Sequence, residues 1–96
     1  MPLRFEWDEE KAASNVAKQG VTFDEARTVF GDPLAAIFDD EEHSRDELRE
    51  MIIGRSVLQR LVLVSFTARG EEVVRIIRAR NARQRERKDD EEGTRP

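Results

Sequence analysis

The run Leu61-Val62-Leu63-Val64-Ser65-Phe66 decides the fold class of this chain. It is continuously apolar and rich in residues that favour strands, so it predicts a central β-strand covered on both faces. The turn Thr67-Ala68-Arg69-Gly70 separates this strand from the next one. The other predicted strands lie at residues 34–38, 47–55 and 72–79, with a short one at residues 3–7.

Two helices are indicated in the first third of the chain. Asp8 is placed as the N-cap of the first helix, which Gly20 ends. Thr22 and Glu25 have the spacing of a capping box, a reciprocal pair that opens a helix, and Gly31 ends this second helix. Together with the strands, they predict an α+β fold in which two N-terminal helices pack on a small antiparallel sheet.

The chain of 96 residues has room for one domain with a modest core. We expect this domain to span residues 1–88 and to end in a basic helix that starts near Asn81, and we expect the acidic residues 89–96 to be disordered. Cysteine is absent, which rules out disulfides, thiolate metal ligands and a cysteine nucleophile. No apolar run approaches the roughly 18 residues of a membrane span, so we expect a cytoplasmic protein.

Charge is distributed unevenly along the chain, although the formal net charge is only -4. Residues 1–54 carry 6 Lys or Arg and 14 Asp or Glu, whereas residues 55–88 carry 10 and 3. A protein that is acidic overall is therefore basic over its last strand and final helix. This local excess is compatible with a polyanionic partner such as nucleic acid.

The arginines of the last predicted strand divide between its two faces if side chains alternate regularly. One face would carry Val73, Arg75, Ile77 and Ala79, and the other Val74, Ile76, Arg78 and Arg80. A guanidinium between apolar neighbours, as at Arg75, is costly to desolvate unless the side chain extends out to water or meets an anion, either a nearby carboxylate or a phosphate. Beyond the strand, polar and basic residues recur at helical spacing, which fits either a solvated helix face or nucleic-acid contact. They are Arg83, Gln84, Arg87 and Lys88.

His43 is the one histidine of the chain and lies in an acidic loop. Most such histidines are ordinary surface residues. The nearby carboxylates of Glu41, Glu42, Asp46 and Glu47 favour its protonated form, which suits a proton donor. The residues alone leave both interpretations open.

A set of short motifs runs in order from residue 5 to about residue 90. The first are Phe5-Glu6-Trp7-Asp8 with Lys11 and Asn15, and Lys18-Gln19-Gly20-Val21-Thr22-Phe23 with Ala26 and Val29-Phe30. They continue with Asp32-Pro33, His43-Ser44 with Glu47 and Arg49, Ile53-Gly54-Arg55-Ser56, Arg75-Ile76-Ile77, Ala79-Arg80 and Glu86-Arg87. In this combination the chain resembles the BrnT family, the ribonuclease toxins of BrnT/BrnA type II toxin–antitoxin systems, which have a RelE-like fold.

The resemblance implies a metal-independent endoribonuclease, without a cofactor, that blocks translation by cutting RNA. A BrnA-like antitoxin with a ribbon-helix-helix fold would neutralise it in a hetero-oligomer that contains two toxins. Operator DNA would be bound only through the antitoxin, and no membrane contact is expected. The basic region would attract an acidic antitoxin segment as readily as RNA.

The resemblance also suggests roles for individual residues. Arg75 and Arg80 lie at matching positions, and an arginine fork suits the charge that a phosphate develops during cleavage. His43 would donate or accept a proton, with Glu47 as its orienting partner or as an alternative base. The other basic residues expected to contact RNA are Arg55, Arg78, Arg83, Arg87 and Lys88.

Three positions depart from the family pattern. Gln19 replaces a histidine, Arg78 replaces a serine that would cap the final helix, and an acid at or near Asp90 replaces a tyrosine. Gln19 and the missing tyrosine support a second hypothesis, a toxin homologue with attenuated activity that acts as a corepressor with its antitoxin on operator DNA. A third hypothesis is a stand-alone nucleic-acid binder whose footprint is residues 55–88.

Overall fold

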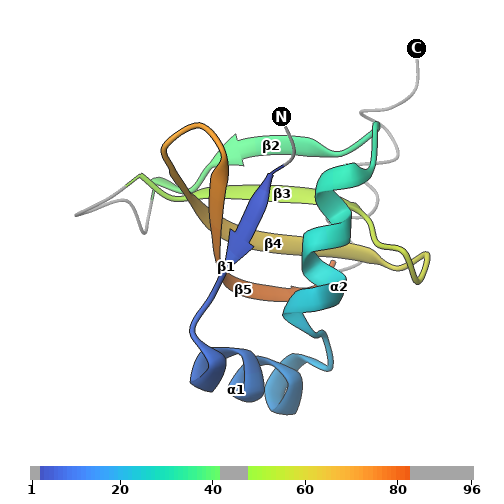
Figure 1. The fold of residues 1–96 in the computed structure, drawn as a ribbon. Coiled ribbons are helices and arrows are strands. Elements are labelled where there is room, and N and C mark those ends of the chain that lie inside the picture. Colours follow the sequence, from blue (N-terminus) through green and yellow to red (C-terminus); the bar gives the residue numbers. More distant parts are fainter. Residues whose placement is uncertain (1–2, 42–47, 83–96) are drawn as a thin grey trace.

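A central strand, β4 (Leu61–Arg69), organises the fold. The computed structural model describes residues 3–41 and 48–82. In chain order the other elements are β1 (Arg4–Glu6), α1 (Glu9–Gln19), α2 (Phe23–Thr28), the 3₁₀ helix η1 (Val29–Gly31), β2 (Ala36–Asp39), β3 (Glu50–Arg55) and β5 (Val73–Asn81). The strands form one sheet in the order β1-β5-β4-β3-β2; α2 packs on one face of it, and α1 lies beyond its β5 edge (Figure 1). The α+β prediction is confirmed.

The sheet is mixed, because β1 runs parallel to β5 while the other pairs are antiparallel. The parallel pair is short: Phe5 lies opposite Val74, and the Arg4 amide donates to the Glu72 carbonyl over 2.7 Å. The wholly antiparallel sheet predicted from the sequence is therefore wrong at this edge. The alternation of residues 3–7 indicates a strand but does not identify the strand that it pairs with. Pairing with β5 allows Phe5 to pack against the core.

α1 begins and ends at its predicted capping residues, whereas α2 begins as predicted but ends at Thr28, and the 3₁₀ helix η1 continues to Gly31, where the sequence predicts the helix end. The Asp8 carboxylate accepts hydrogen bonds from two amides in the first turn of α1, and Gly20 ends that helix with a left-handed φ of 69°. The Thr22 hydroxyl accepts from the Glu25 amide over 2.9 Å and opens α2. The predicted capping box is only half formed, since the Glu25 carboxylate turns toward the loop between β3 and β4.

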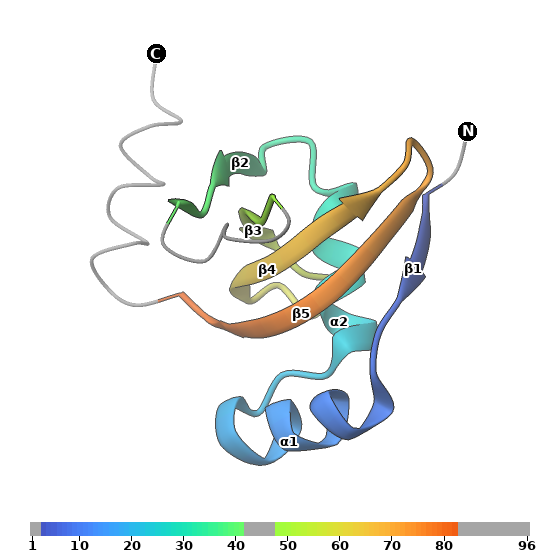
Figure 2. The same ribbon diagram turned by 90° about the vertical axis from the view of Figure 1, so that its left-hand side faces the viewer.

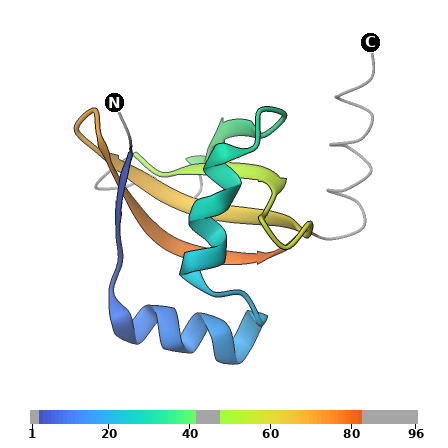
Figure 3. The same cartoon turned by 45° about the vertical axis from the view of Figure 1, so that its right-hand side comes forward.

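The main core lies between the helices and the sheet, where α2 crosses in front of the strands (Figure 3). Three aromatic rings meet edge to face within it: the Phe30 centroid lies 5.2 Å from that of Phe5 and 5.0 Å from that of Phe66. Burying a side chain such as Phe66 contributes about 1.5–3 kcal/mol. The buried residues of this core are Val21, Phe23, Ala26, Val29, Ile52, Val62, Val64, Phe66, Val74, Ile76 and Ala79.

Strand β4 is buried on both faces, as its sequence predicts, and every residue from Leu61 to Thr67 is buried. Its side chains in the helix-side core are Val62, Val64 and Phe66. Leu61 and Leu63 belong instead to a smaller apolar cluster with Ile53 on the opposite face. We call this second face, on the other side of the sheet from α2, the open face, although the side chains of its apolar cluster are themselves buried.

The last two strands are longer than the sequence predicts. β4 continues through Arg69, so the chain turns at Gly70, whose φ of 74° is left-handed. β5 continues through Asn81, where the sequence predicts the start of a basic helix. That helix and the acidic tail, from residue 83 onward, lie outside the described residues and stay predictions. Neither described helix is long and apolar enough to cross a membrane.

Candidate nucleic-acid interface

An extra residue in β5 controls which side chains reach the open face. Ser65 of β4 pairs with Arg78, but the next residue of β4 pairs with Ile76, so Ile77 has no counterpart and forms a β-bulge. The alternation of side chains between the two faces changes phase at this bulge. The residues of β5 that belong to the helix-side core are Val74, Ile76 and Ala79, and the last two are separated by two residues rather than one.

The bulge brings Arg75, Arg78 and Arg80 to the open face, and we call these three residues the arginine row. Arg75 lies between two core residues, and the other two arginines flank the core residue Ala79. Regular alternation predicts Arg75 on one face and Arg78 and Arg80 on the other, and this prediction is wrong. The small Ala79 packs in the core while the guanidinium groups stay outside it, because burying an arginine there would be costly.

The arginine row runs beside the apolar cluster of the open face. Figure 2 shows β1, β5 and β4 side by side with α2 behind them. Arg80 lies opposite Leu63, which belongs to that cluster. Arg55 ends β3 opposite Leu61 and, by strand alternation, points to the same face. The structure therefore places Arg55 and the arginine row on one face, with the cluster between Arg55 and Arg80.

Two contacts fix the end of β3, where Arg55 stands. The Asp32 carboxylate accepts a hydrogen bond from the Arg55 amide over 2.7 Å. Gly54 faces the helix layer so closely that a β-carbon there would lie 2.8 Å from the Ala35 Cβ and 2.9 Å from Asp32 Oδ2. Any larger residue would push β3 away from the helix layer, so glycine keeps this end of the strand in place.

Arg75 is engaged by a carboxylate on the adjacent strand. Its Nη1 atom lies 3.4 Å from the Oε2 atom of Glu6 in β1, so the carboxylate is the partner that the structure shows for this arginine. Both side chains stay in contact with water, with exposed fractions of 32% and 45%. An ion pair this exposed is weak, because water screens it, and a phosphate can compete for the guanidinium.

Several predicted site residues fall outside the described part of the chain. They are His43, Glu47, Arg83, Arg87 and Lys88. Arg78 is described and lies within β5, so the interpretation of position 78 as the lost cap of a helix is wrong. Within residues 3–41 and 48–82, no group of three or more His, Cys, Asp or Glu side chains could hold a metal ion.

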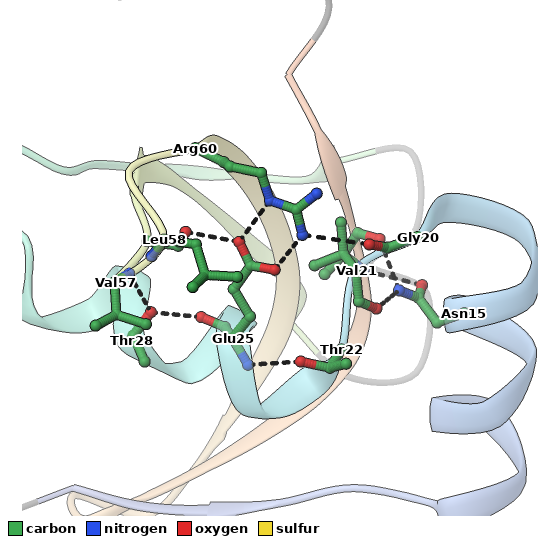
Figure 4. Close-up of polar contacts among 11 residues, drawn as sticks. Asn15, Gly20, Val21, Thr22, Glu25, Thr28, Val57, Leu58 and Arg60 are labelled. Atoms are coloured by element: carbon green, nitrogen blue, oxygen red, sulfur yellow. Dashed lines mark hydrogen bonds and ion pairs between the residues drawn. The ribbon is translucent and has the colours of Figure 1, made fainter.

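Asn15, a buried residue of α1, joins the helix layer to β5. Its Nδ2 donates to the carbonyls of Val21 and Ala79 over 2.8 Å each, and its Oδ1 accepts from the Ala79 amide over 3.1 Å (Figure 4). The sequence placed Asn15 in a family motif only, and this contact was missed. The signal that points to it is an asparagine inside a helix, because asparagine is unfavourable there unless its amide finds a partner.

A second polar network, also drawn in Figure 4, ties α2 to the loop between β3 and β4. The Arg60 guanidinium donates to both carboxylate oxygens of Glu25, and the Ser56 hydroxyl donates to one of them over 2.6 Å. These hydrogen bonds, chiefly the one from Arg60, lower the pKa of Glu25 although its burial acts in the opposite direction. The same pairing raises the pKa of Arg60.

The loop is also held through its backbone. The Thr28 hydroxyl at the end of α2 accepts from the Val57 amide over 2.9 Å and donates to the Glu25 carbonyl over 2.6 Å. Gln59 completes the loop with a left-handed φ of 62°, an uncommon conformation for a residue other than glycine. Because Glu25 and Arg60 neutralise each other in the helix layer, this network stabilises the scaffold rather than adding charge to the open face.

Comparisons with known proteins cover nearly all of this structure. A family model described as the BrnT ribonuclease toxin of type II toxin–antitoxin systems matches residues 7–86, which include every described element from α1 to β5. The crystal structure of the Brucella abortus ribonuclease toxin BrnT is similar, with a TM-score of 0.67 and 27% sequence identity. The match covers 85% of this chain and 99% of that chain. No curated protein matches the sequence significantly.

Proposed function

This chain belongs to the BrnT family of ribonuclease toxins from type II toxin–antitoxin systems, and we propose that it is a metal-independent endoribonuclease. It cuts RNA and so inhibits translation in the cytoplasm. The observation that carries this proposal is the arginine row, three arginines on one face of the sheet. The RelE-like classification and the basic C-terminal helix stay predictions of the sequence.

Cleavage of RNA without a metal uses the 2'-hydroxyl as an internal nucleophile. The protein then removes the proton of that hydroxyl, protonates the leaving 5'-oxygen and stabilises the extra negative charge on the phosphate. The arginine row suits the last task, because a guanidinium can donate two parallel hydrogen bonds to phosphate oxygens. Arg78 and Arg80 are alternate residues about 7 Å apart along the strand, so their long side chains can reach one phosphate.

We assign Arg75 and Arg80 the role of clamps on the phosphate that is attacked, and Arg55 and Arg78 the role of holding the flanking RNA backbone. Arg75 takes part only when the RNA phosphate replaces Glu6 as its partner. The exposed geometry of that ion pair supports such an exchange. The four arginines then act on one strand of RNA that crosses the open face.

Proton transfer falls to residues outside the described part of the chain. We assign it to His43, with Glu47 as its orienting partner or as the alternative base. Arg83, Arg87 and Lys88 add contacts to the RNA backbone in this proposal. Their positive charge, like that of the arginine row, predicts binding that weakens with salt.

RNA cleavage in the presence of a chelator tests the nuclease proposal. We expect Arg80→Ala to lower kcat on the order of 10²- to 10³-fold, the effect of removing one group that stabilises transition-state charge. The matched control is Arg27→Ala, an exposed arginine of α2 that pairs with Asp24 over 3.5 Å and should cleave like the wild type. If Arg80→Ala and His43→Ala both cleave at the wild-type rate, the residue assignment is wrong.

A second function, corepression with the antitoxin without RNA cleavage, is favoured by one observation. Glu6 occupies Arg75 and so reduces the positive charge that the open face offers to RNA. The contribution of Gln19, an exposed residue at the end of α1, to this second function stays a prediction. RNA that stays intact in chelator, together with tight operator binding by the toxin–antitoxin complex, would establish corepression instead.

Membership in a type II toxin–antitoxin family implies an antitoxin partner. We propose a BrnA-like ribbon-helix-helix protein that neutralises the toxin in a hetero-oligomer with two toxins and alone contacts operator DNA. Expression of this gene should arrest growth, and coexpression of the neighbouring antitoxin gene should restore it. Light scattering on the purified complex measures the number of toxins.

A further inference from the structure

The part of β5 that carries Arg78 and Arg80 has little support from the sheet along its outer edge. β1 pairs only with Val73–Arg75, and no other described strand continues along that edge. A strand with one unpaired edge is held in register by the neighbouring strand on its other side alone. A bulge in such a strand can shift by one residue. The position of the two arginines therefore depends on whatever else holds this edge.

Asn15 holds the edge at Ala79, between the two arginines. Its side-chain amide donates to the Ala79 carbonyl over 2.8 Å and accepts from the Ala79 amide over 3.1 Å, the two bonds that a neighbouring strand would supply. Its other Nδ2 hydrogen donates to the Val21 carbonyl over 2.8 Å, just after α1 ends. Both donors and the acceptor are used, so the orientation of this amide is fixed.

The contact selects the bulged register over the regular one. Without the bulge, Ala79 would lie opposite Leu63 and Arg78 opposite Val64, one position from where they stand. A shift by one residue exchanges bonded and non-bonded pairs, so the amide and carbonyl of Ala79 would turn toward β4 and away from Asn15. It would also turn Arg78 into the helix-side core.

We propose that Asn15 is a positioning residue of the arginine row, which fixes the bulge at Ile77 and thereby directs Arg78 and Arg80 toward RNA. This inference rests on the proposed function, since the row acts on RNA only if the protein is a nuclease. Asn15 itself is buried and touches no substrate. Its effect on cleavage passes through the backbone of Ala79.

The kinetic test compares Asn15→Ala with Val29→Ala, a core variant of the helix layer that leaves the contact with Ala79 intact. Both proteins are assayed in chelator at a temperature where their unfolding curves show them folded. We expect kcat to fall about 10- to 100-fold in Asn15→Ala with a smaller change in KM, because misplaced clamps lose their effect chiefly in the transition state. Val29→Ala should keep both constants within about twofold of the wild type.

Hydrogen exchange measured by NMR adds a readout that a loss of overall stability would not give. In Asn15→Ala the amide of Ala79 should lose its protection while that of Val64, in the central strand, keeps it. Val29→Ala should leave the Ala79 amide protected. Asn15→Asp retains an acceptor for this amide but loses both donors, so its kcat should lie between those of the wild type and Asn15→Ala.

The wild type and Arg80→Ala separate failure of this inference from failure of the proposed function. If the wild type leaves RNA intact in chelator, the nuclease proposal fails. If the wild type cleaves and Arg80→Ala cleaves equally well, the clamp role of the arginine row fails, and the role of Asn15 in positioning it fails as well. If Arg80→Ala loses cleavage while folded Asn15→Ala and Asn15→Asp keep the wild-type kcat, the positioning role is overturned and the nuclease stands. If neither Asn15 variant folds, the wild type decides the question. Slow exchange of its Ala79 amide supports the positioning role of Asn15, and rapid exchange overturns that role.

Discussion

The two faces of the sheet use charge in different ways. On the helix side, the buried carboxylate of Glu25 is met by Arg60, and the pair fixes a loop to α2. On the open face, the arginine row lies at the surface, and its ion pair with Glu6 is half exposed. Charge in the helix layer therefore stabilises the fold, whereas charge on the open face stays in contact with water, where a ligand can reach it.

Of these substitutions, Phe66→Ala should lower the stability of the protein most. The Phe66 ring is buried and stacks edge to face on Phe30, so its loss should lower the free energy of unfolding by about 4 kcal/mol, as measured by urea denaturation. The matched control is Phe38→Ala in β2, where the side chain is exposed and the change should stay below about 1 kcal/mol. Folded Phe66→Ala should bind RNA like the wild type, and weaker binding per folded molecule would contradict the separation of the two faces.

Glu25→Gln should have the next largest effect, about 2 kcal/mol at pH 7, because Arg60 and Ser56 lose a charged acceptor. Arg60 lowers the pKa of Glu25 below its ordinary value of 4.5 in the folded protein. The stabilising contribution is therefore complete above that ordinary value and is lost as the pH falls through the lowered one.

Unfolding curves at pH 7 and pH 3 measure this dependence. The difference in stability between the wild type and Glu25→Gln should shrink on acidification. Asp24→Asn, an exposed change in the same helix, should alter stability by less than about 0.5 kcal/mol at either pH. A difference that is equal at both pH values would show that the ionised carboxylate does not stabilise the loop.

Arg78→Ala tests the open face without disturbing the core. Its stability should change by less than about 0.5 kcal/mol, since the side chain is exposed. RNA affinity should fall about fivefold at moderate salt, and the slope of log affinity against log salt should decrease by about 1, the signature of one lost phosphate contact. Filter binding at several salt concentrations measures both. An unchanged slope would show that Arg78 does not contact an RNA phosphate.

Glu6→Gln should have the smallest effect and the opposite sign. It removes the carboxylate that competes for Arg75, so RNA affinity should rise about twofold at low salt while stability changes by less than about 0.5 kcal/mol. The same binding assay measures the gain. Weaker binding would mean that Glu6 orients Arg75 for RNA instead of competing with it.

Much of the helix side could be predicted from the sequence, because its signals are local. Asp8, Gly20 and Thr22 mark helix ends through hydrogen bonds to residues close in sequence. The continuous apolar run of β4 predicts that this strand is buried on both faces. The partner of Glu25 is not local. Spacing suggested a capping box, whereas Arg60, 35 residues away, offers a stronger charge-assisted bond.

For the open face, the sequence identified residues but not their geometry. The arginines of the row were recognised, yet regular alternation assumes that no residue is extra, and the bulge at Ile77 depends on tertiary packing. Asn15 contacts Ala79 across 64 residues, so no local pattern reports it. His43 and Glu47 lie outside the described residues, and their roles stay predictions.

Strand β5 is the last described strand along the chain, yet it lies between β1 and β4. While a ribosome synthesises the protein, β1 has no strand to pair with, and Asn15 lacks the backbone of Ala79, until residues 73–81 have emerged. The surface that holds the guanidinium groups is therefore among the last parts to assemble. A nascent chain therefore lacks the finished arginine row for most of its synthesis.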